Sequence, residues 1–413
     1  MGGSIAGAAF GAAILLALVA NPIAYAVLAL VGFMGYRIGV STMALTRPAF
    51  GIKGSLLPTT LNTIVFLGWA VVNTFIAVIS MSYIFQDLFS WPAYGEPGGT
   101  RPMILGIVIM TLLNLGAVSI GRQSVKIVER IGIVLILILG VWVTVIVFQT
   151  HSFADVIAWR PTIETALPFG KAIDLMAAFS LSWVLGIAEF TRYTRTKAAA
   201  TVAPMLGATV SLIWFVFVGL LATIGVALTT GEFNPDNSDP SSLVSSLGLG
   251  WMALLLIVVA CVTTNVVNLM AAGVSVTNVT RKIKPIYSIW IVTILAGILM
   301  LIPLFAESFL DTFMNFLDFL GMALSALLGI LIADYFVIKR RKYKVDEFTK
   351  LGGKYWYYKG VNLRAIAVWV FGVLFYLLIH NLSVVTAAVG AVYPTVIVTG
   401  ILYAIVSMST MEK

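Results

Sequence analysis

The chain has 413 residues, of which 60% are hydrophobic and 10% are charged, with a mean hydropathy of +1.04 and a formal net charge of +8. A soluble domain carries roughly a quarter charged residues, so this composition excludes an ordinary soluble fold. The apolar residues fall in blocks of about 20 or more, the length at which a helix crosses a bilayer core. Strands of a membrane barrel would alternate polar and apolar residues, and these blocks do not. We therefore expect an all-α polytopic membrane protein.

Eleven apolar blocks are long enough to span a membrane. In chain order they cover residues 13–36, 57–86, 103–121, 131–149, 172–190, 203–229, 246–274, 286–305, 310–338, 362–380 and 386–408. The stub before them, Met1 to Ala12, would reach only about 18 Å as a helix, which is too short to cross. The sequence thus predicts eleven full helices preceded by half of another.

Basic residues orient these spans, because Lys and Arg in short loops stay on the cytoplasmic side. Among the 25 basic residues, only Arg101, Arg160 and Lys171 lie in the outer set of alternate loops, so the split is 22 to 3. We expect a multi-pass protein of the inner (plasma) membrane with a cytoplasmic C-terminus. The net positive charge then reflects topology and attraction to the lipid bilayer rather than binding of nucleic acid.

The sequence gives little support for an enzyme. The two histidines, His151 and His380, cannot form a metal cluster with the single cysteine, Cys261. Motifs of hydrolases, kinases and dinucleotide-binding enzymes are missing from the sequence. We therefore predict a protein that is not an enzyme and has no cofactor, apart from Na⁺ or H⁺ as a coupling ion.

Polar residues inside spans are informative because burying them in lipid is costly. In the second block, FLGWAVVNTF places Trp69 and Asn73 one helical turn apart on one face. The indole offers a stacking surface, and the amide both donates and accepts hydrogen bonds, which suits a flat heterocycle. The alternative is an interfacial tryptophan beside an asparagine that bonds a neighbouring helix.

The fifth block is interrupted by small and polar residues. Its sequence AAFSLSWVLGIAEFTRYTR contains Ser180, Ser182 and Gly186 beside Phe179 and Trp183. Such a helix can unwind locally and expose backbone groups to a cavity, as the discontinuous helices of transporters do. The serines alternatively bond back to their own helix.

The seventh block carries a cation-binding pattern. In ACVTTNVVNLMAAG, one face presents Ala260, Thr263, Thr264 and Asn268, with Asn265 beside it. Two hydroxyls and a backbone carbonyl suit a hard cation such as Na⁺. Threonines often bond back within membrane helices, so the structural alternative stays open.

Asp318 lies toward the outer end of the ninth block. A carboxylate inside a membrane helix is a candidate proton relay. Near the outer end, a hydrated aspartate needs no partner, and we favour that interpretation.

The motifs together resemble the nucleobase:cation symporter family. The resemblance rests on RIGVSTMALTRPAFGIKGSLLP, FLGW, SLSW with AEFTRYTR, TTN with AAGVSVTN, and IADYFVIKRRKYKVDEF followed by GGKYWYYKGVNLRA. That family includes cytosine and purine permeases, hydantoin and allantoin transporters, and predicted carriers of hydroxymethylpyrimidine. The resemblance implies import of such a planar heterocycle by symport with Na⁺ or H⁺. A symporter of another small solute, such as an amino acid or vitamin, and a non-transporting substrate sensor are the alternatives.

The resemblance also implies a fold, namely the leucine-transporter type with a 5+5 inverted repeat and two additional C-terminal helices. One transporter domain would cover 1–413, with the first repeat at 1–149 lacking half of its first helix. The second repeat would occupy 171–338, a cytoplasmic loop 339–361, and the last two helices 362–413.

The same resemblance assigns roles to the polar residues. It implies a substrate site made by Trp69, Asn73, Phe179, Ser180, Ser182, Trp183, Asn265 and Asn268, and a Na⁺ site made by Ala260, Thr263 and Thr264. Cytosine permeases have asparagine where this chain has Ala260, and the hydroxymethylpyrimidine branch has an acidic residue where Asn268 stands. Relatives draw further Na⁺ ligands from the unwound middle of a complete first helix, so the given chain is expected to bind Na⁺ weakly.

Overall fold

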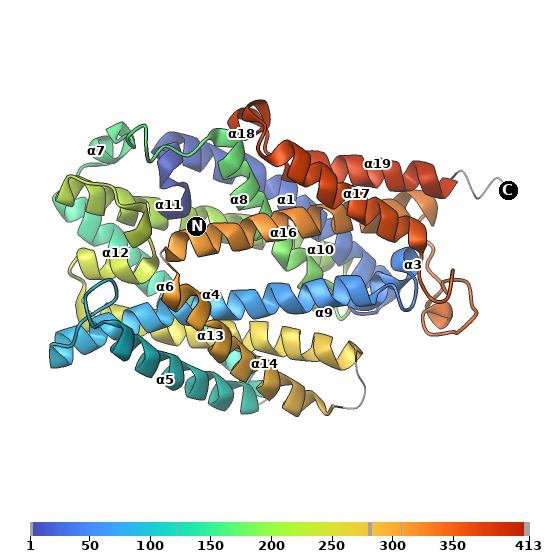
Figure 1. Ribbon diagram of the computed structural model, residues 1–413, viewed down its shortest axis with the longest axis horizontal. Helices are drawn as coiled ribbons and strands as arrows, with labels where there is room; N and C mark the ends of the chain where they lie inside the picture. The colour runs from blue at the N-terminus through green and yellow to red at the C-terminus, as the bar shows by residue number, and fades with distance from the viewer. Residues whose placement is uncertain (1–2, 121, 280–282, 307, 409–413) are drawn as a thin grey trace. The chain divides into compact units, whose positions relative to one another are not determined.

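The computed structural model describes residues 3–120, 122–279, 283–306 and 308–408, which form helices joined by loops (Figure 1). The long helices are α1 (Phe10–Ile38), α4 (Leu56–Phe89), α5 (Thr100–Ser119), α6 (Arg122–Thr150), α11 (Val202–Thr230), α13 (Gly250–Val279), α14 (Pro285–Leu299), α16 (Phe309–Ile332), α17 (Leu363–His380) and α19 (Val392–Met408). The shorter ones are α2 (Thr42–Leu45), α3 (Arg47–Phe50), α7 (Phe153–Ala158), α8 (Phe169–Ser182), α9 (Ala188–Thr191), α10 (Lys197–Ala200), α12 (Pro240–Ser246), α15 (Leu301–Phe305) and α18 (Ser383–Ala388). The 3₁₀ segments are η1 (Gly3–Ala8), η2 (Trp183–Gly186), η3 (Pro235–Asn237) and η5 (Val345–Glu347), and η4 (Ala333–Ile338) is a π-helical turn.

By length and composition, ten helical segments in the described part of the chain are apolar and long enough to cross a membrane. The shorter apolar helix α19, with 17 residues, corresponds to the last predicted block. All eleven predicted blocks therefore coincide with helices, which confirms the all-α membrane fold class at the level of its elements.

Glycines explain the largest boundary differences. The block predicted at 246–274 begins as the helix α13 only at Gly250, because the positive φ angles of Gly248 and Gly250, 68° and 75°, separate it from the preceding α12. The block predicted at 386–408 is similarly divided by Gly390, whose φ is 69°, between α18 and α19. A hydropathy pattern does not register these turns, because glycine is weakly apolar itself.

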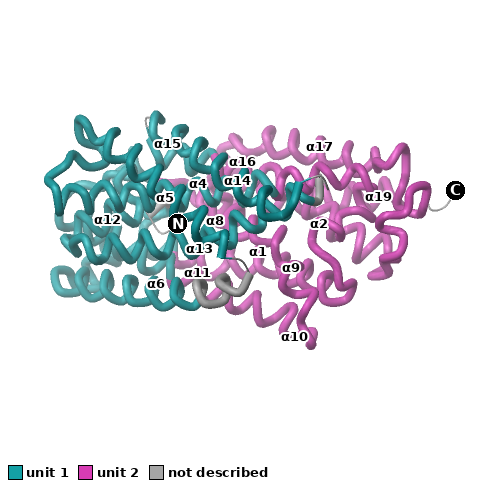
Figure 2. Tube along the Cα trace, turned by 90° about the horizontal axis from the view of Figure 1, so that it is seen from below, with its two compact units in different colours: residues 1–13, 63–166, 215–315 teal, residues 14–62, 167–214, 316–413 magenta. Residues whose placement is uncertain are grey.

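The chain divides into two compact units, each assembled from separate segments (Figure 2). Unit 1 contains Met1–Ala13, Thr63–Ala166 and Phe215–Asn315, and unit 2 contains Ile14–Asn62, Leu167–Trp214 and Phe316–Lys413. Both units draw on the first and the second half of the sequence. The proposed repeats at 1–149 and 171–338, with the loop 339–361 and the helices of 362–413, remain a prediction.

Unit 1 is organised around α13, which packs against α5, α6 and α14. Small residues permit the close contacts. A Cβ on Gly273 would lie 2.9 Å from the Cα of Ile289 in α14, and the Ser288 hydroxyl donates to the Gly273 carbonyl at 2.8 Å. On α6, a Cβ on Gly132 would overlap the hydroxyl of Thr263. Close backbone approach of this kind is how membrane helices gain packing energy without a hydrophobic driving force.

In unit 2, the 339–361 loop folds onto the connection between α1 and α4. The Asn362 amide donates to the Ala49 carbonyl at 2.7 Å, and the Asn362 backbone N–H donates to Phe50 O at 2.8 Å. Buried Asp334, in η4, accepts from the hydroxyls of Tyr343 at 2.7 Å and Tyr403 at 2.8 Å. The Asp334 carboxylate and the Asn362 amide are therefore provided with partners, which is the condition for burying them at low cost.

A second carboxylate in unit 2 caps a helix. Asp174 of α8 is 2% exposed, and its two oxygens accept the backbone N–H groups of Ala391 and Val392, each at 2.8 Å. These donors have no partner within α19 because they start the helix. Gly390 is required next to them, since a Cβ there would overlap the Asp174 carboxylate. Asp174 therefore fixes the start of α19 against α8.

Replacing Asp174 by asparagine should destabilise the protein by roughly 1–3 kcal/mol, because the amide NH₂ would face a backbone N–H and leave it unpaired. Thermal unfolding of the purified protein in detergent measures this loss. Asp155→Asn is the control, since Asp155 makes a similar capping contact at Ser152 in an exposed position. Equal losses in the two variants would show that the buried cap contributes nothing special.

Candidate functional site

Helix α4 presents an aromatic and an amide on one face of unit 1, as predicted. The helix continues unbroken through Trp69 and Asn73. Trp69 is 5% exposed, and its ring meets that of Phe313 edge to face with centroids 6.1 Å apart. Asn73 is half-buried. A flat ring and a hydrogen-bonding edge thus lie one turn apart, and their role toward a substrate stays a prediction.

The predicted cation ligands are close together on α13. The hydroxyls of Thr263 and Thr264 both donate to the carbonyl of Ala260, at 2.7 and 3.0 Å. This is the back-bonded arrangement that the sequence left open as an alternative. Each hydroxyl keeps lone pairs for a cation. The Ala260 carbonyl already accepts both hydroxyl protons, so it is available to Na⁺ only when the hydroxyls turn away from it. Within the described ranges, no cluster of three or more His, Cys, Asp or Glu side chains is positioned to hold a metal.

Two asparagines on α13 are completely buried but differ in their bonding. The Asn265 amide nitrogen donates to the Thr74 hydroxyl at 2.7 Å and approaches the Ala70 carbonyl at 3.4 Å, while its oxygen has no partner. Asn268 is also fully buried, and neither its nitrogen nor its oxygen has a partner in the described structure. An unsatisfied buried amide costs about 1–3 kcal/mol. Asn268 is therefore the strongest candidate for a group that a ligand satisfies.

The sequence analysis missed Thr74 and Asn114. Both are buried, and the Asn114 amide of α5 donates to the Thr74 hydroxyl at 3.3 Å. The signal was available, because Asn114 is an asparagine inside the apolar third block. Only the folded chain shows that it shares an acceptor with Asn265.

In unit 2, the helix of the fifth block changes its type at the position where the sequence left local unwinding and back-bonding serines both open. Helix α8 ends at Ser182 and continues as the 3₁₀ turn η2 before α9. The Ser182 hydroxyl bonds back to Phe179 O at 2.6 Å, as the structural alternative predicted. The Ser180 hydroxyl instead donates to the Asn21 side chain of α1 at 3.2 Å. Asn21, which the sequence analysis did not single out, is fully buried with an unpartnered amide nitrogen.

The candidate residues thus form two groups, each within its own unit. Unit 1 contains Trp69, Asn73, Ala260, Thr263, Thr264, Asn265 and Asn268, and unit 2 contains Phe179, Ser180, Ser182 and Trp183. Phe179 and Trp183 are half-buried on either side of the point where α8 becomes η2.

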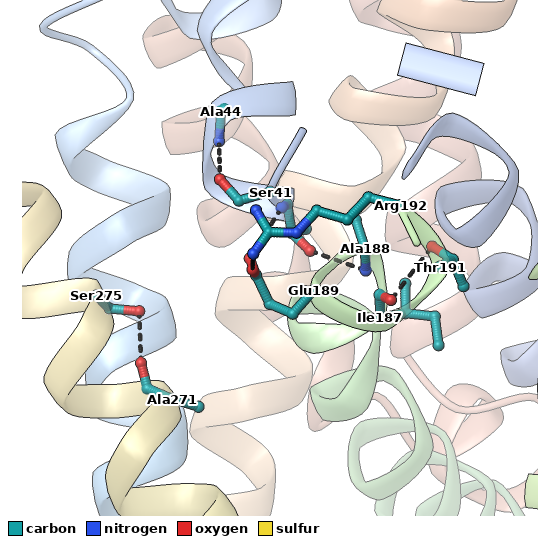
Figure 3. Close-up of polar contacts among 10 residues, drawn as sticks. Ser41, Ala44, Ile187, Ala188, Glu189, Thr191, Arg192, Ala271 and Ser275 are labelled. Atoms are coloured by element: carbon teal, nitrogen blue, oxygen red, sulfur yellow. Dashed lines mark hydrogen bonds and ion pairs between the residues drawn. The ribbon is translucent and has the colours of Figure 1, made fainter. Parts of the chain in front are cut away.

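Two of the motifs that carry the family resemblance meet in unit 2 (Figure 3). The Thr42 hydroxyl accepts from the Ala188 backbone N–H at 3.2 Å, and the Thr42 N–H donates to Glu189 at 3.2 Å. Glu189 also pairs with Arg192 at 3.0 Å. These bonds attach the connection after α1 to α9. Figure 3 also draws Ser275 of unit 1, whose hydroxyl bonds back to Ala271 at 2.9 Å.

The expectation that Asp318 needs no partner is wrong. Lys171 of α8 lies 2.6 Å from an Asp318 carboxylate oxygen, and the two side chains are only 19% and 22% exposed. His380 of α17 is 3.9 Å from the same oxygen and 3.5 Å from the Lys171 ammonium. The partner was not evident because 147 residues separate Lys171 from Asp318.

Sequence comparison relates this chain to permeases. A family model described as a permease for cytosine/purines, uracil, thiamine and allantoin matches residues 1–403. The chain is 25% identical over 381 residues to the allantoin permease of Bacillus subtilis, covering 86% of this chain and 74% of that one. It is 25% identical over 371 residues to the hydantoin permease of Microbacterium maritypicum, covering 86% and 72%.

Solved structures show the same fold. Mhp1, a nucleobase-cation-symport-1 family transporter in a closed conformation with bromovinylhydantoin bound, superposes with a TM-score of 0.77 at 18% identity, over 99% of this chain and 88% of Mhp1. MhsT in complex with L-phenylalanine gives a TM-score of 0.56 at 12% identity, over 97% and 93%. These similarities confirm the leucine-transporter-type fold expected from the sequence.

The Lys171–Asp318 pair should contribute about 1 kcal/mol, because partial exposure screens the attraction. A double-mutant cycle of Lys171→Met, Asp318→Asn and the double variant measures this coupling by thermal unfolding in detergent. We expect the double variant to lose less stability than the two single variants together. Lys350→Met removes a salt bridge whose lysine is 64% exposed and should change nothing measurable. Additive losses at Lys171 and Asp318 would mean that the pair is not coupled.

Proposed function

Because this chain belongs to the family of permeases for cytosine and purines, uracil, thiamine and allantoin, we propose that it imports a nucleobase or related planar heterocycle by symport with a cation. The named relatives carry allantoin and hydantoin, which are cyclic ureides with alternating C=O and N–H groups. The protein is a multi-pass membrane protein, as its apolar helices and its family require. The observation that carries the choice of substrate class is the pair of buried, incompletely bonded amides at Asn265 and Asn268.

The chemistry of these groups matches such a ring. An amide offers a donor and an acceptor side by side, and a cyclic ureide presents the complementary pair. Stacking on Trp69 would add on the order of 1 kcal/mol beyond the burial of apolar area. In this proposal Asn73, Asn265 and Asn268 pair with the polar edge. Phe179, Ser180, Ser182 and Trp183 supply further contacts where α8 gives way to η2.

For coupling, we propose that Na⁺ binds the Ala260 carbonyl and the Thr263 and Thr264 hydroxyls. Hard cations prefer such oxygens and usually take about six or more ligands, so further oxygens complete the site. Proton coupling is the competing choice for the same transport cycle.

For topology, the 22 to 3 distribution of basic residues supports an inner (plasma) membrane location with the C-terminus in the cytoplasm. This orientation would place the 339–361 loop on the cytoplasmic side.

Uptake of radiolabelled bases into proteoliposomes tests the substrate class. We expect accumulation of at least one member of a panel of cytosine, uracil, purines, hydantoin, allantoin and hydroxymethylpyrimidine, and we expect Trp69→Ala to abolish it. Trp251→Ala, at a tryptophan 39% exposed on α13, is the control and should transport normally. Accumulation of amino acids instead would redirect the proposal to another solute. Binding of a base without accumulation would indicate a sensor.

The cation is tested in the same vesicles with the transported base. An inward Na⁺ gradient should drive uptake. Thr264→Ala should raise the Na⁺ concentration needed for half-maximal uptake by about tenfold or more, because it removes one ligand worth over about 1 kcal/mol. Thr144→Ala removes a back-bonded threonine on α6 and serves as the control. Uptake driven by a pH gradient and indifferent to Na⁺ would establish proton coupling.

A further inference from the structure

The hydroxyl of Thr74 is the centre of a buried polar network in unit 1. Thr74 is 1% exposed and donates its single proton to the Ala70 carbonyl at 2.7 Å. Its oxygen then accepts the amide nitrogens of Asn265 at 2.7 Å and Asn114 at 3.3 Å. One hydroxyl thus joins three helices, α4, α5 and α13. With one donor and two lone pairs, its bonding capacity is fully used.

This network fixes which end of the Asn265 amide faces α4. The amide group that points toward Thr74 meets two acceptors, the hydroxyl oxygen and the Ala70 carbonyl at 3.4 Å. Only the NH₂ end has two hydrogens to offer both acceptors. The reversed orientation would place the amide oxygen against the Ala70 carbonyl and would require the Thr74 hydroxyl to withdraw its proton from that carbonyl. The carbonyl end of Asn265 therefore points away from Thr74, and it is buried without a partner.

Asn268 provides the contrast on the same helix. It lies three residues after Asn265, so the two amides are neighbours on one face of α13. No described group bonds either end of Asn268, so hydrogen bonding does not fix which end of its amide faces a ligand. One amide is thus restricted to accepting, while its neighbour accepts or donates according to the ligand. Two adjacent unsatisfied amides on one helix face point to a ligand that completes them.

We propose that Thr74 is a specificity-determining positioning residue, which holds Asn265 so that it offers the substrate only a carbonyl acceptor. The substrate would then have to place an N–H donor against Asn265. This selects heterocycles with an unsubstituted ring N–H or an exocyclic amine and discriminates against their N-alkylated forms. The inference rests on the proposed function, because it concerns recognition of the same heterocycle.

Thr74 occupies a suitable place for this role. It directly follows Asn73, and Ala70 directly follows Trp69, so the network adjoins the turn of α4 that carries the proposed stacking and hydrogen-bonding groups. A purely structural role for Thr74 would tie α4 to α13 without affecting which ligands bind. The experiment must separate these two roles.

The test uses matched competitors of uptake in proteoliposomes. One series is hydantoin with 1-methylhydantoin, 3-methylhydantoin and succinimide, in which CH₂ replaces one ring N–H. The other is uracil with its 1-methyl and 3-methyl derivatives. For the wild type, loss of the critical N–H should weaken competition by about tenfold or more, because the Asn265 carbonyl is left unpaired.

Thr74→Val keeps the shape of the side chain and removes the hydroxyl. We expect the penalty for losing the N–H to fall to about threefold or less. The half-saturation concentration of the unsubstituted base should rise, with its maximal rate unchanged. Thr74→Ser restores the hydroxyl and should restore the discrimination. Thr144→Val is the matched control, since Thr144 bonds back to the Gly140 carbonyl at 2.7 Å and holds no asparagine in the described part of the chain.

The outcomes distinguish this inference from the proposed function. In one outcome, Thr74→Val binds every competitor less tightly by the same factor and still discriminates against the N-methylated compounds as the wild type does. That result would overturn the specificity role and leave transport of heterocycles intact. A wild type that already ignores N-methylation would overturn it as well. The proposed function itself would be refuted if the wild type bound no base of either series and no base of the uptake panel.

Discussion

The core of a bilayer contains no water, so a polar backbone or side-chain group that is buried there must find its hydrogen-bond partner within the protein. This constraint shapes the whole structure. Helices meet that demand for the backbone. Breaks in helices are tolerated where side chains take over. Asp174 bonds the first N–H groups of α19, and Asp334 takes two tyrosine hydroxyls beside the π-helical turn η4. The irregular points of unit 2 are thus supported by buried carboxylates with both oxygens in use.

Against that background, incomplete bonding is informative. Asn268 has no partner at either end, and Asn265 uses only its nitrogen. Both are completely buried, and both lie on α13, the helix around which unit 1 packs. A transporter needs groups that are partly unsatisfied without substrate, because binding energy comes from completing them. The same logic separates Asp174 and Asp334, which hold helices together, from the amides, which are available to a ligand.

Close packing around α13 gives these amides a rigid support. Gly273 allows α14 to approach at backbone distance, and Gly132 allows α6 to reach Thr263. A second rigid contact lies in unit 2, where the 339–361 loop folds onto the connection between α1 and α4. There the backbone N–H of Lys354 and the ammonium of Lys350 hold the pKa of Glu347 below its usual range.

The sequence alone determined the membrane class and the eleven helical segments, because hydrophobic length is a property of neighbouring residues. At Ser182 to Gly186 it left local unwinding and back-bonding serines both open. It also placed Trp69 with Asn73, and Ala260 with Thr263 and Thr264, because one helix turn fixes their spacing. Only the tertiary structure showed that Asn265 and Asn114 both donate to Thr74, and that Lys171 pairs with Asp318. Those partners come from helices 40, 191 and 147 residues away along the chain, and no local pattern records which distant helix packs against which.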